Sequence, residues 1–260
     1  MDLLRVSLVQ AKLFWESPQQ NRSHLEVLMR ELAGKTDLVV LPEMFTTGFT
    51  MRPEALAEPT EGRTLNWLSE QASKLGCAIT GSIVVVEDNR FYNRLIWVFP
   101  NGEYNCYDKR HLFSMAQEPE HYSAGKNRLI LNYKGWRINP LICYDLRFPV
   151  FARNSVDHPF DLQIFVANWP AVRNHPWKVL LAARAIENQC FVIGVNRVGE
   201  DGNGIDHSGD SRLIDPKGNN ILAIPAHQEL VETTSISKEE LSRFRAKFPV
   251  LNDADSFTLH

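Results

Sequence analysis

The stretch CAITGSIVVVEDNRFYNRLIWVFPNGEYNCYDK, residues 77–109, decides between the fold classes open to this chain. It reads as strand, turn, strand, turn, strand, with no helical period in between. Consecutive strands joined by short turns run antiparallel, whereas parallel neighbours need a long crossover connection. Part of the sheet structure is therefore predicted to be antiparallel.

Outside this stretch, strand-like and helix-like segments alternate. Apolar runs predict further strands at residues 3–9, 37–43, 136–145, 161–169, 190–199 and 211–216. Apolar spacing predicts helices at residues 17–34, 61–75 and 176–188, and Ser237 with Glu240 matches a capping box that opens a last helix. The helix at 176–188 is expected to bury Val179, Leu180, Ala183 and Ile186. Alternation combined with antiparallel pairing predicts an α/β sandwich of mixed sheets with outer helices, rather than a doubly wound fold.

Length and composition fit a single domain over residues 1–260. The chain has 44% hydrophobic and 23% charged residues and a formal net charge of −3, so it offers no basic surface for nucleic acid. No apolar run is long enough to predict a membrane span, and the N-terminus does not read as a signal peptide. The four cysteines, at 77, 106, 143 and 190, are widely spaced and form no CxxC pair. We therefore expect a cytoplasmic protein without a disulfide framework.

Three apolar runs end in a polar residue that can do chemistry. Glu43 follows DLVVLP, Lys109 closes YNCYDK, and Cys143 follows PLI. A carboxylate can generate the thiolate of a nearby cysteine, and a lysine can stabilise an oxyanion, so the set describes an acyl-transfer site. Each residue also has a plain structural interpretation, because a lone cysteine is more often core packing and strand-end charges are often solvated.

The segments LPEMFTTGF, YDKRHLF and CYDLRFP resemble, in this order, the three signature blocks of the nitrilase superfamily of carbon–nitrogen hydrolases. The segments ANWP, RAIENQ and HSGDSRLIDPKG fit the same family, so the resemblance spans residues 10 to 230 or so and leaves a C-terminal helix and tail at 237–260. It implies a four-layer αββα sandwich with two mixed β-sheets. It also implies Glu43 as general base, Lys109 as oxyanion stabiliser and Cys143 as nucleophile, with no metal and no cofactor.

The resemblance further implies a second catalytic glutamate between the lysine and the cysteine. The segment EPEHYSAG offers Glu118 and Glu120. Counting back seven residues from Gly125, as in small amidases of the family, selects Glu118, while Glu120 stays open.

Substrate recognition is less constrained by the sequence. Arg147, four residues past the cysteine, can clamp a substrate carboxylate or form a structural pair with Asp145 or another acid. Phe45 and Trp169 are candidates for lining a small pocket, and the backbone N–H of Tyr144 is expected at the oxyanion.

The residues of these motifs most resemble those of the omega-amidase branch, whose members deamidate 2-oxoglutaramate and 2-oxosuccinamate. The expected function is hydrolysis of the terminal amide of such a 2-oxo acid through a thioester, by a homodimer. Alternatives are another reaction of the superfamily, on a nitrile, an N-carbamoyl amine or an aliphatic amide, and a non-catalytic member that binds a small molecule or a partner protein.

Overall fold

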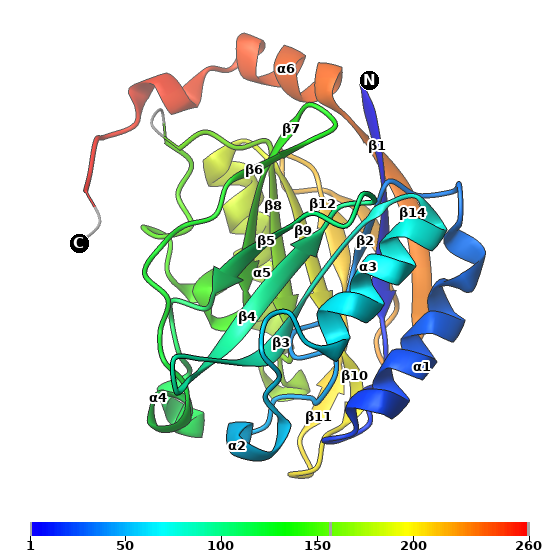
Figure 1. Cartoon of the computed structure of the whole chain (residues 1–260). Helices are drawn as coiled ribbons and strands as arrows, with labels where there is room; N and C mark the ends of the chain where they lie inside the picture. The colour runs from blue at the N-terminus through cyan, green and yellow to red at the C-terminus, as the bar shows by residue number, and fades with distance from the viewer. Residues whose placement is uncertain (1, 156–157, 259–260) are drawn as a thin grey trace.

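Two six-stranded mixed sheets form the framework of the computed structural model, which describes residues 2–155 and 158–258 (Figure 1). The first sheet has the strand order β14-β1-β2-β3-β4-β5 and the second the order β13-β12-β9-β8-β7-β6. Each sheet has a parallel centre flanked by antiparallel strands. The predicted sandwich of mixed sheets is confirmed.

The first sheet contains the stretch that decides the fold class. Its strands are β1 (Leu3–Gln10), β2 (Leu38–Val40), β3 (Ala78–Glu87), β4 (Arg90–Val98), β5 (Tyr104–Asp108) and β14 (Leu230–Ser237). Strands β3, β4 and β5 pair antiparallel, as residues 77–109 predict. Strand β14 was not predicted, and it pairs with β1 along its whole length.

The second sheet holds the strand that leads to the candidate nucleophile. Its strands are β6 (Leu131–Tyr133), β7 (Trp136–Ile142), β8 (Leu162–Ala167), β9 (Phe191–Asn196), β12 (Arg212–Ile214) and β13 (Asn220–Ala223). A separate hairpin is formed by β10 (Val198–Glu200) and β11 (Asp206–Ser208). The strand predicted at 136–145 ends earlier, at Ile142, because the chain turns at Cys143 into a 3-10 helix (Cys143–Arg147).

Helices cover the outer faces of the sandwich. Helices α1 (Pro18–Met29) and α3 (Arg63–Leu75) lie side by side against the first sheet, and α5 (Asn174–Asn188) packs on β9 of the second (Figure 1). The short helices α2 (Pro53–Leu56) and α4 (Glu118–His121) lie at one end of the sandwich, and α6 (Lys238–Lys247) crosses the other (Figure 1). The Ser237 hydroxyl accepts the Glu240 N–H at 3.2 Å, which caps α6 and forms the N-cap half of the predicted capping box. No helix in the described part of the chain is long and apolar enough to cross a membrane.

The buried stripe of α5 differs from the prediction. The helix buries Trp177, Leu181 and Ala185, while Val179 is 49% and Ile186 53% exposed. The buried face of α5 packs closely on β9 because Gly194 of that strand has no side chain. A Cβ at Gly194 would lie only 2.4 Å from the Leu181 side chain. Two apolar stripes share this helix, so spacing alone could not tell the inner from the outer one.

The main core lies between the two sheets. It joins side chains of β1, β2 and β4 to side chains of β7, β8 and β9, while a second core fills the space between the first sheet and helices α1 and α3. The central strands are thus covered on both faces, which explains their continuously apolar sequences. Polar residues at the ends of these strands come together at the end of the sandwich where α4 and the β10–β11 hairpin lie (Figure 1).

Candidate active site

Cys143 lies at the first residue after β7, where the backbone changes direction. Its φ is +44°, in the left-handed region that L-residues other than glycine rarely adopt. The turn leaves the half-buried residue in contact with the main core while it also lines a pocket. Strain of this kind persists only where surrounding contacts hold it, and it concentrates at functional sites.

Lys109 joins two buried glutamates. Its Nζ lies 2.9 Å from Oε1 of Glu43 and 2.9 Å and 3.0 Å from the two carboxylate oxygens of Glu118. All three side chains are buried, and the Lys109 ammonium also lies 5.0 Å from the ring centroid of Phe49. Buried charges need this degree of pairing, since an unpaired one would carry a large desolvation cost.

Two asparagines hold the Glu43 carboxylate. Asn93, on β4, donates from Nδ2 to Oε1 at 2.8 Å. Asn168, the first residue after β8, donates its backbone N–H to Oε2 at 2.8 Å, and its Nδ2 donates to the Glu43 carbonyl at 2.6 Å. Both carboxylate oxygens are therefore oriented by donors, and the charge of this carboxylate acts on the Cys143 thiol at the same pocket.

The electrostatics of the cluster keep the thiol protonated at rest. Burial, together with the nearby Glu43 charge, raises the pKa of Cys143 well above its usual value. Burial opposes the ammonium of Lys109, but the charges of Glu118 and Glu43 outweigh it and raise the lysine pKa. Burial also raises the pKa of Glu118, against the pull of Lys109. Lys109 thus stays a cation, and the thiol needs an adjacent base to become a nucleophile.

A pocket with a cavity volume of about 70 Å³ opens above Cys143. Its walls come from separate segments of the chain and include Glu43, Phe49, Lys109, Phe113, Tyr144, Arg147, Asn168, Trp169, Arg173, Asp201 and His207. The guanidinium carbon of Arg147 lies 5.0 Å from the Trp169 ring centroid. No carboxylate of the described residues is within ion-pair distance of the Arg147 guanidinium. The alternative pairing with Asp145 is not formed, because Asp145 accepts hydrogen bonds from Tyr107, His111 and Ile142 instead.

The structure places the other predicted site residues as follows. Glu118 lies in the cluster, whereas Glu120 is exposed and outside it. Trp169 and Tyr144 line the pocket. The expectation that Phe45 lines the pocket is wrong. Its ring is fully buried in the core under α3, with its centroid 6.0 Å from that of Trp67. The ring packs against Gly81, where a side chain would leave no room for it. Phe49 lines the pocket where Phe45 was expected.

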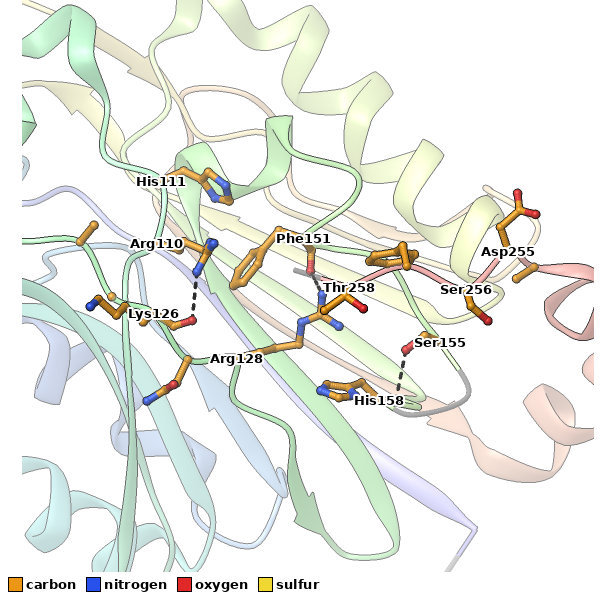
Figure 2. Close-up of a pocket in the computed structure, with 15 residues that line it drawn as sticks. Arg110, His111, Lys126, Arg128, Phe151, Ser155, His158, Asp255, Ser256 and Thr258 are labelled. Carbon is orange, nitrogen blue, oxygen red and sulfur yellow. Dashed lines mark hydrogen bonds between the residues drawn. The ribbon is translucent and has the colours of Figure 1, made fainter. Parts of the chain in front are cut away.

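A wider hollow of about 960 Å³ lies elsewhere, between the chain after β5 and the C-terminal tail (Figure 2). Figure 2 shows Arg110 and Arg128 on the ring of Phe151, with guanidinium carbons 5.3 Å and 5.2 Å from the ring centroid. None of its described lining residues lines the pocket above Cys143. Its size therefore does not make it the reacting site, because the candidate nucleophile and base are not there.

Comparison with known proteins identifies the family of the chain. The sequence model of the carbon-nitrogen hydrolase family matches residues 5–246, and the chain belongs to this family. The chain is 45% identical to omega-amidase YafV of Escherichia coli K12 over 98% of each chain, and 32% identical to 2-oxoglutaramate amidase of Bacillus subtilis over 95% of this chain and 96% of that one. It superposes with a TM-score of 0.98 on the crystal structure of XC1258 from Xanthomonas campestris, a CN-hydrolase superfamily protein with an arsenic adduct in its active site; the two are 50% identical and aligned over 100% of both chains.

Proposed function

We propose that the protein hydrolyses the terminal amide of a small 2-oxo acid such as 2-oxoglutaramate or 2-oxosuccinamate, releasing the acid and ammonia. The observation that carries this proposal is the convergence of Cys143, Glu43 and Lys109 at one pocket that also holds Arg147. The names of the relatives from Escherichia coli and Bacillus subtilis support the same activity.

In the first half of the reaction Cys143 is acylated. Glu43 takes the thiol proton as Sγ attacks the amide carbon, which forms a tetrahedral intermediate with a negatively charged oxygen. Lys109 and the backbone N–H of Tyr144 stabilise this oxyanion. The C–N bond then breaks, Glu43 gives its proton to the leaving nitrogen, and ammonia and a thioester on Cys143 result.

The second half regenerates the enzyme. Water attacks the thioester carbon as Glu43 takes one of its protons, and the same oxyanion donors stabilise the second intermediate. The C–S bond breaks, the thiolate recovers a proton from Glu43, and the carboxylic acid leaves. Glu118 holds the Lys109 ammonium in place through both halves by its two contacts of 2.9 Å and 3.0 Å.

Arg147 supports a substrate that carries a carboxylate. It lies at the pocket without a described acidic partner, so a substrate carboxylate can bind its guanidinium with two hydrogen bonds. The small cavity favours a short substrate, consistent with a monoamide of a four- or five-carbon acid.

The proposal is tested by ammonia release from 2-oxoglutaramate, glutamine, an aliphatic nitrile and N-carbamoyl-β-alanine. Strong turnover of 2-oxoglutaramate that disappears in Cys143→Ala is expected. Preference for another compound of the panel would retain the nucleophile and reject the substrate class. Inactivity on all four, with a Cys143 that resists iodoacetamide, would favour a non-catalytic binding protein.

We also propose that two copies associate through the outer face of α5. Val179 and Ile186 are half exposed there, and Val172 in the preceding turn is 84% exposed, which is unusual for apolar side chains that have no partner. Light scattering should give a dimer mass for the wild type and a monomer mass for Ile186→Asp. A wild-type monomer at micromolar concentration would reject the dimer.

A nucleophilic thiol must stay reduced, so we place the enzyme in the cytoplasm.

A further inference from the structure

Arg173 brings a second guanidinium to the pocket above Cys143, besides that of Arg147. It is the last residue of the 3-10 turn Ala171–Arg173 that follows Trp169. Its backbone carbonyl accepts the indole N–H of Trp169 at 2.7 Å. Its side chain donates no hydrogen bond and forms no ion pair within the described part of the chain. The charge of Arg173 is therefore not neutralised by any described carboxylate.

Solvent reaches the Arg173 guanidinium, so a ligand can reach it as well. The side chain is half-buried. Elsewhere in the described chain, a guanidinium nitrogen is both buried and unpaired in Arg128, Arg184 and Arg197. No nitrogen of Arg173 is in that state, although none has a described partner either. The Arg173 donors are therefore accessible and available to a bound molecule.

The ring of Phe113 places this guanidinium on a wall of the pocket. The guanidinium carbon of Arg173 lies 5.5 Å from the Phe113 ring centroid, and both residues line the pocket although they come from distant segments of the chain. The Phe113 ring meets the ring of Tyr144, the residue after Cys143, edge to face with the centroids 5.0 Å apart. The Phe113 N–H donates to Oε2 of Glu118, which anchors this wall to the buried charge cluster. The Arg173 side chain thus extends from its own turn to a ring that contacts the neighbour of the candidate nucleophile.

We propose that Arg173 donates a hydrogen bond to the 2-oxo oxygen of the substrate while Arg147 binds its carboxylate. The inference rests on the proposed amidase function and adds a specificity-determining residue to it. The end of a 2-oxo acid remote from the amide carries three acceptor oxygens, two on the carboxylate and one on the neighbouring carbon. One guanidinium edge pairs with the two carboxylate oxygens, so the third oxygen needs another donor. Among the described residues that line the pocket, Arg173 is the cation besides Arg147 that has no acidic partner.

This contact favours a 2-oxo acid over relatives that carry another group at the same carbon. A CH₂ group there offers no acceptor and leaves the Arg173 donors without a substrate partner. A 2-amino group is protonated at neutral pH, and an ammonium cannot accept a hydrogen bond and is repelled by both guanidiniums. Sites that hydrogen-bond a substrate group discriminate against analogues that lack it. Arg173 therefore makes the pocket prefer 2-oxoglutaramate to glutamine.

Comparing 2-oxoglutaramate with glutaramate, the monoamide of glutaric acid, tests this role. The two compounds share the carboxylate, the chain length and the amide, and they differ only in the 2-oxo oxygen. The measured quantity is the ratio of kcat/KM for 2-oxoglutaramate to kcat/KM for glutaramate. In Arg173→Met, which keeps a long side chain but has no donor, this ratio should fall by about tenfold, the effect of losing one hydrogen bond to a charged group.

Arg147→Met is the matched control, because Arg147 is the other unpaired guanidinium of the pocket and both compounds carry the carboxylate it is proposed to bind. It should lower both kcat/KM values by the same factor and leave the ratio unchanged. Arg173→Leu serves if the methionine variant does not fold.

The wild type should prefer 2-oxoglutaramate, and equal kcat/KM values for the two compounds would overturn the inference. An unchanged ratio in a folded Arg173 variant would overturn it too, as would a ratio that falls in Arg147→Met instead. Failure of the wild type on both compounds would reject the proposed function itself, which keeps the two failures distinct.

Discussion

Nδ1 of His111 lies 2.7 Å from Oδ1 of Asp145, which links the segment after Lys109 to the turn that carries Cys143. The same carboxylate accepts the Tyr107 hydroxyl at 2.7 Å and the Ile142 N–H at 3.1 Å. Asp145 thus connects the strand that ends near Lys109 to the residue just before Cys143, the proposed nucleophile. We infer that this carboxylate maintains the left-handed turn at Cys143 and its distance from Lys109.

Asp145→Ala should therefore reduce both stability and turnover. It leaves the Tyr107 hydroxyl, the His111 ring and the Ile142 N–H without their acceptor, which we expect to cost about 3 kcal/mol of unfolding free energy. Urea unfolding measures this loss, and kcat should fall with KM less affected, because the proposed nucleophile is displaced. Wild-type values for both the unfolding free energy and kcat would contradict this role.

Glu118 and Glu120 form a natural matched pair. Glu118→Gln removes the charge that holds Lys109, so kcat should fall by a factor of about a hundred or more, in line with losing one aligned electrostatic group. Glu120 is exposed, so Glu120→Gln should retain wild-type activity within about twofold. Steady-state kinetics on both variants decides between the two, and a reversed result would assign the role to Glu120.

Glu43→Gln should separate thiol acidity from catalysis. The Glu43 charge contributes to the raised pKa of Cys143, whereas Lys109 acts to lower it. Removing that charge should shift the pH profile of iodoacetamide alkylation of Cys143 to lower pH, while amide hydrolysis is lost with its base. Mass spectrometry of the Cys143 peptide follows the alkylation. A profile that stays in place or moves to higher pH would show that Glu43 does not act on the thiol.

His207 makes stability depend on pH. Burial, with a contribution from the Arg197 charge, lowers its pKa from 6.5 to about 4. Above pH 6.5 the histidine is neutral in both the folded and the unfolded chain, so no stability is lost. Between pH 6.5 and 4 the unfolded chain binds a proton that the folded chain does not, which should cost up to about 3 kcal/mol.

The unfolding free energy of the wild type should therefore fall through this pH window. In His207→Gln, whose side chain does not titrate, the fall should be smaller by about the same amount. Parallel pH curves for the two proteins would show that His207 is not the titrating group.

The features predicted best from the sequence were the strands, through their periodicity, and the residues at strand ends. The antiparallel stretch 77–109 is confirmed, since continuous β-pairing there leaves no room for a helix. Strand β14 was missed because its sequence, LVETTSIS, is rich in polar residues, as befits an edge strand. Its partner β1 is far away in the chain, so no local pattern could show the pairing.

At the site, strand-end position pointed to Glu43, Lys109 and Cys143, but not to the asparagines around them. Asn168 follows an apolar run just as Glu43 does, so the same signal was available for it. Asn93 lies inside β4, where a polar residue has no distinctive spacing. Phe45 was misplaced because its side chain packs in the core, next to a left-handed backbone position at Met44 with φ of +42°, and neither feature can be seen in the sequence.

The most direct test of the central claim measures 2-oxoglutarate and ammonia together during hydrolysis of 2-oxoglutaramate by the wild type and by Cys143→Ala. The wild type should form equal amounts of both products, and a folded Cys143→Ala variant should form none above background. Undiminished formation of both products by the variant would contradict the assignment of Cys143 as the nucleophile, and with it the thioester mechanism.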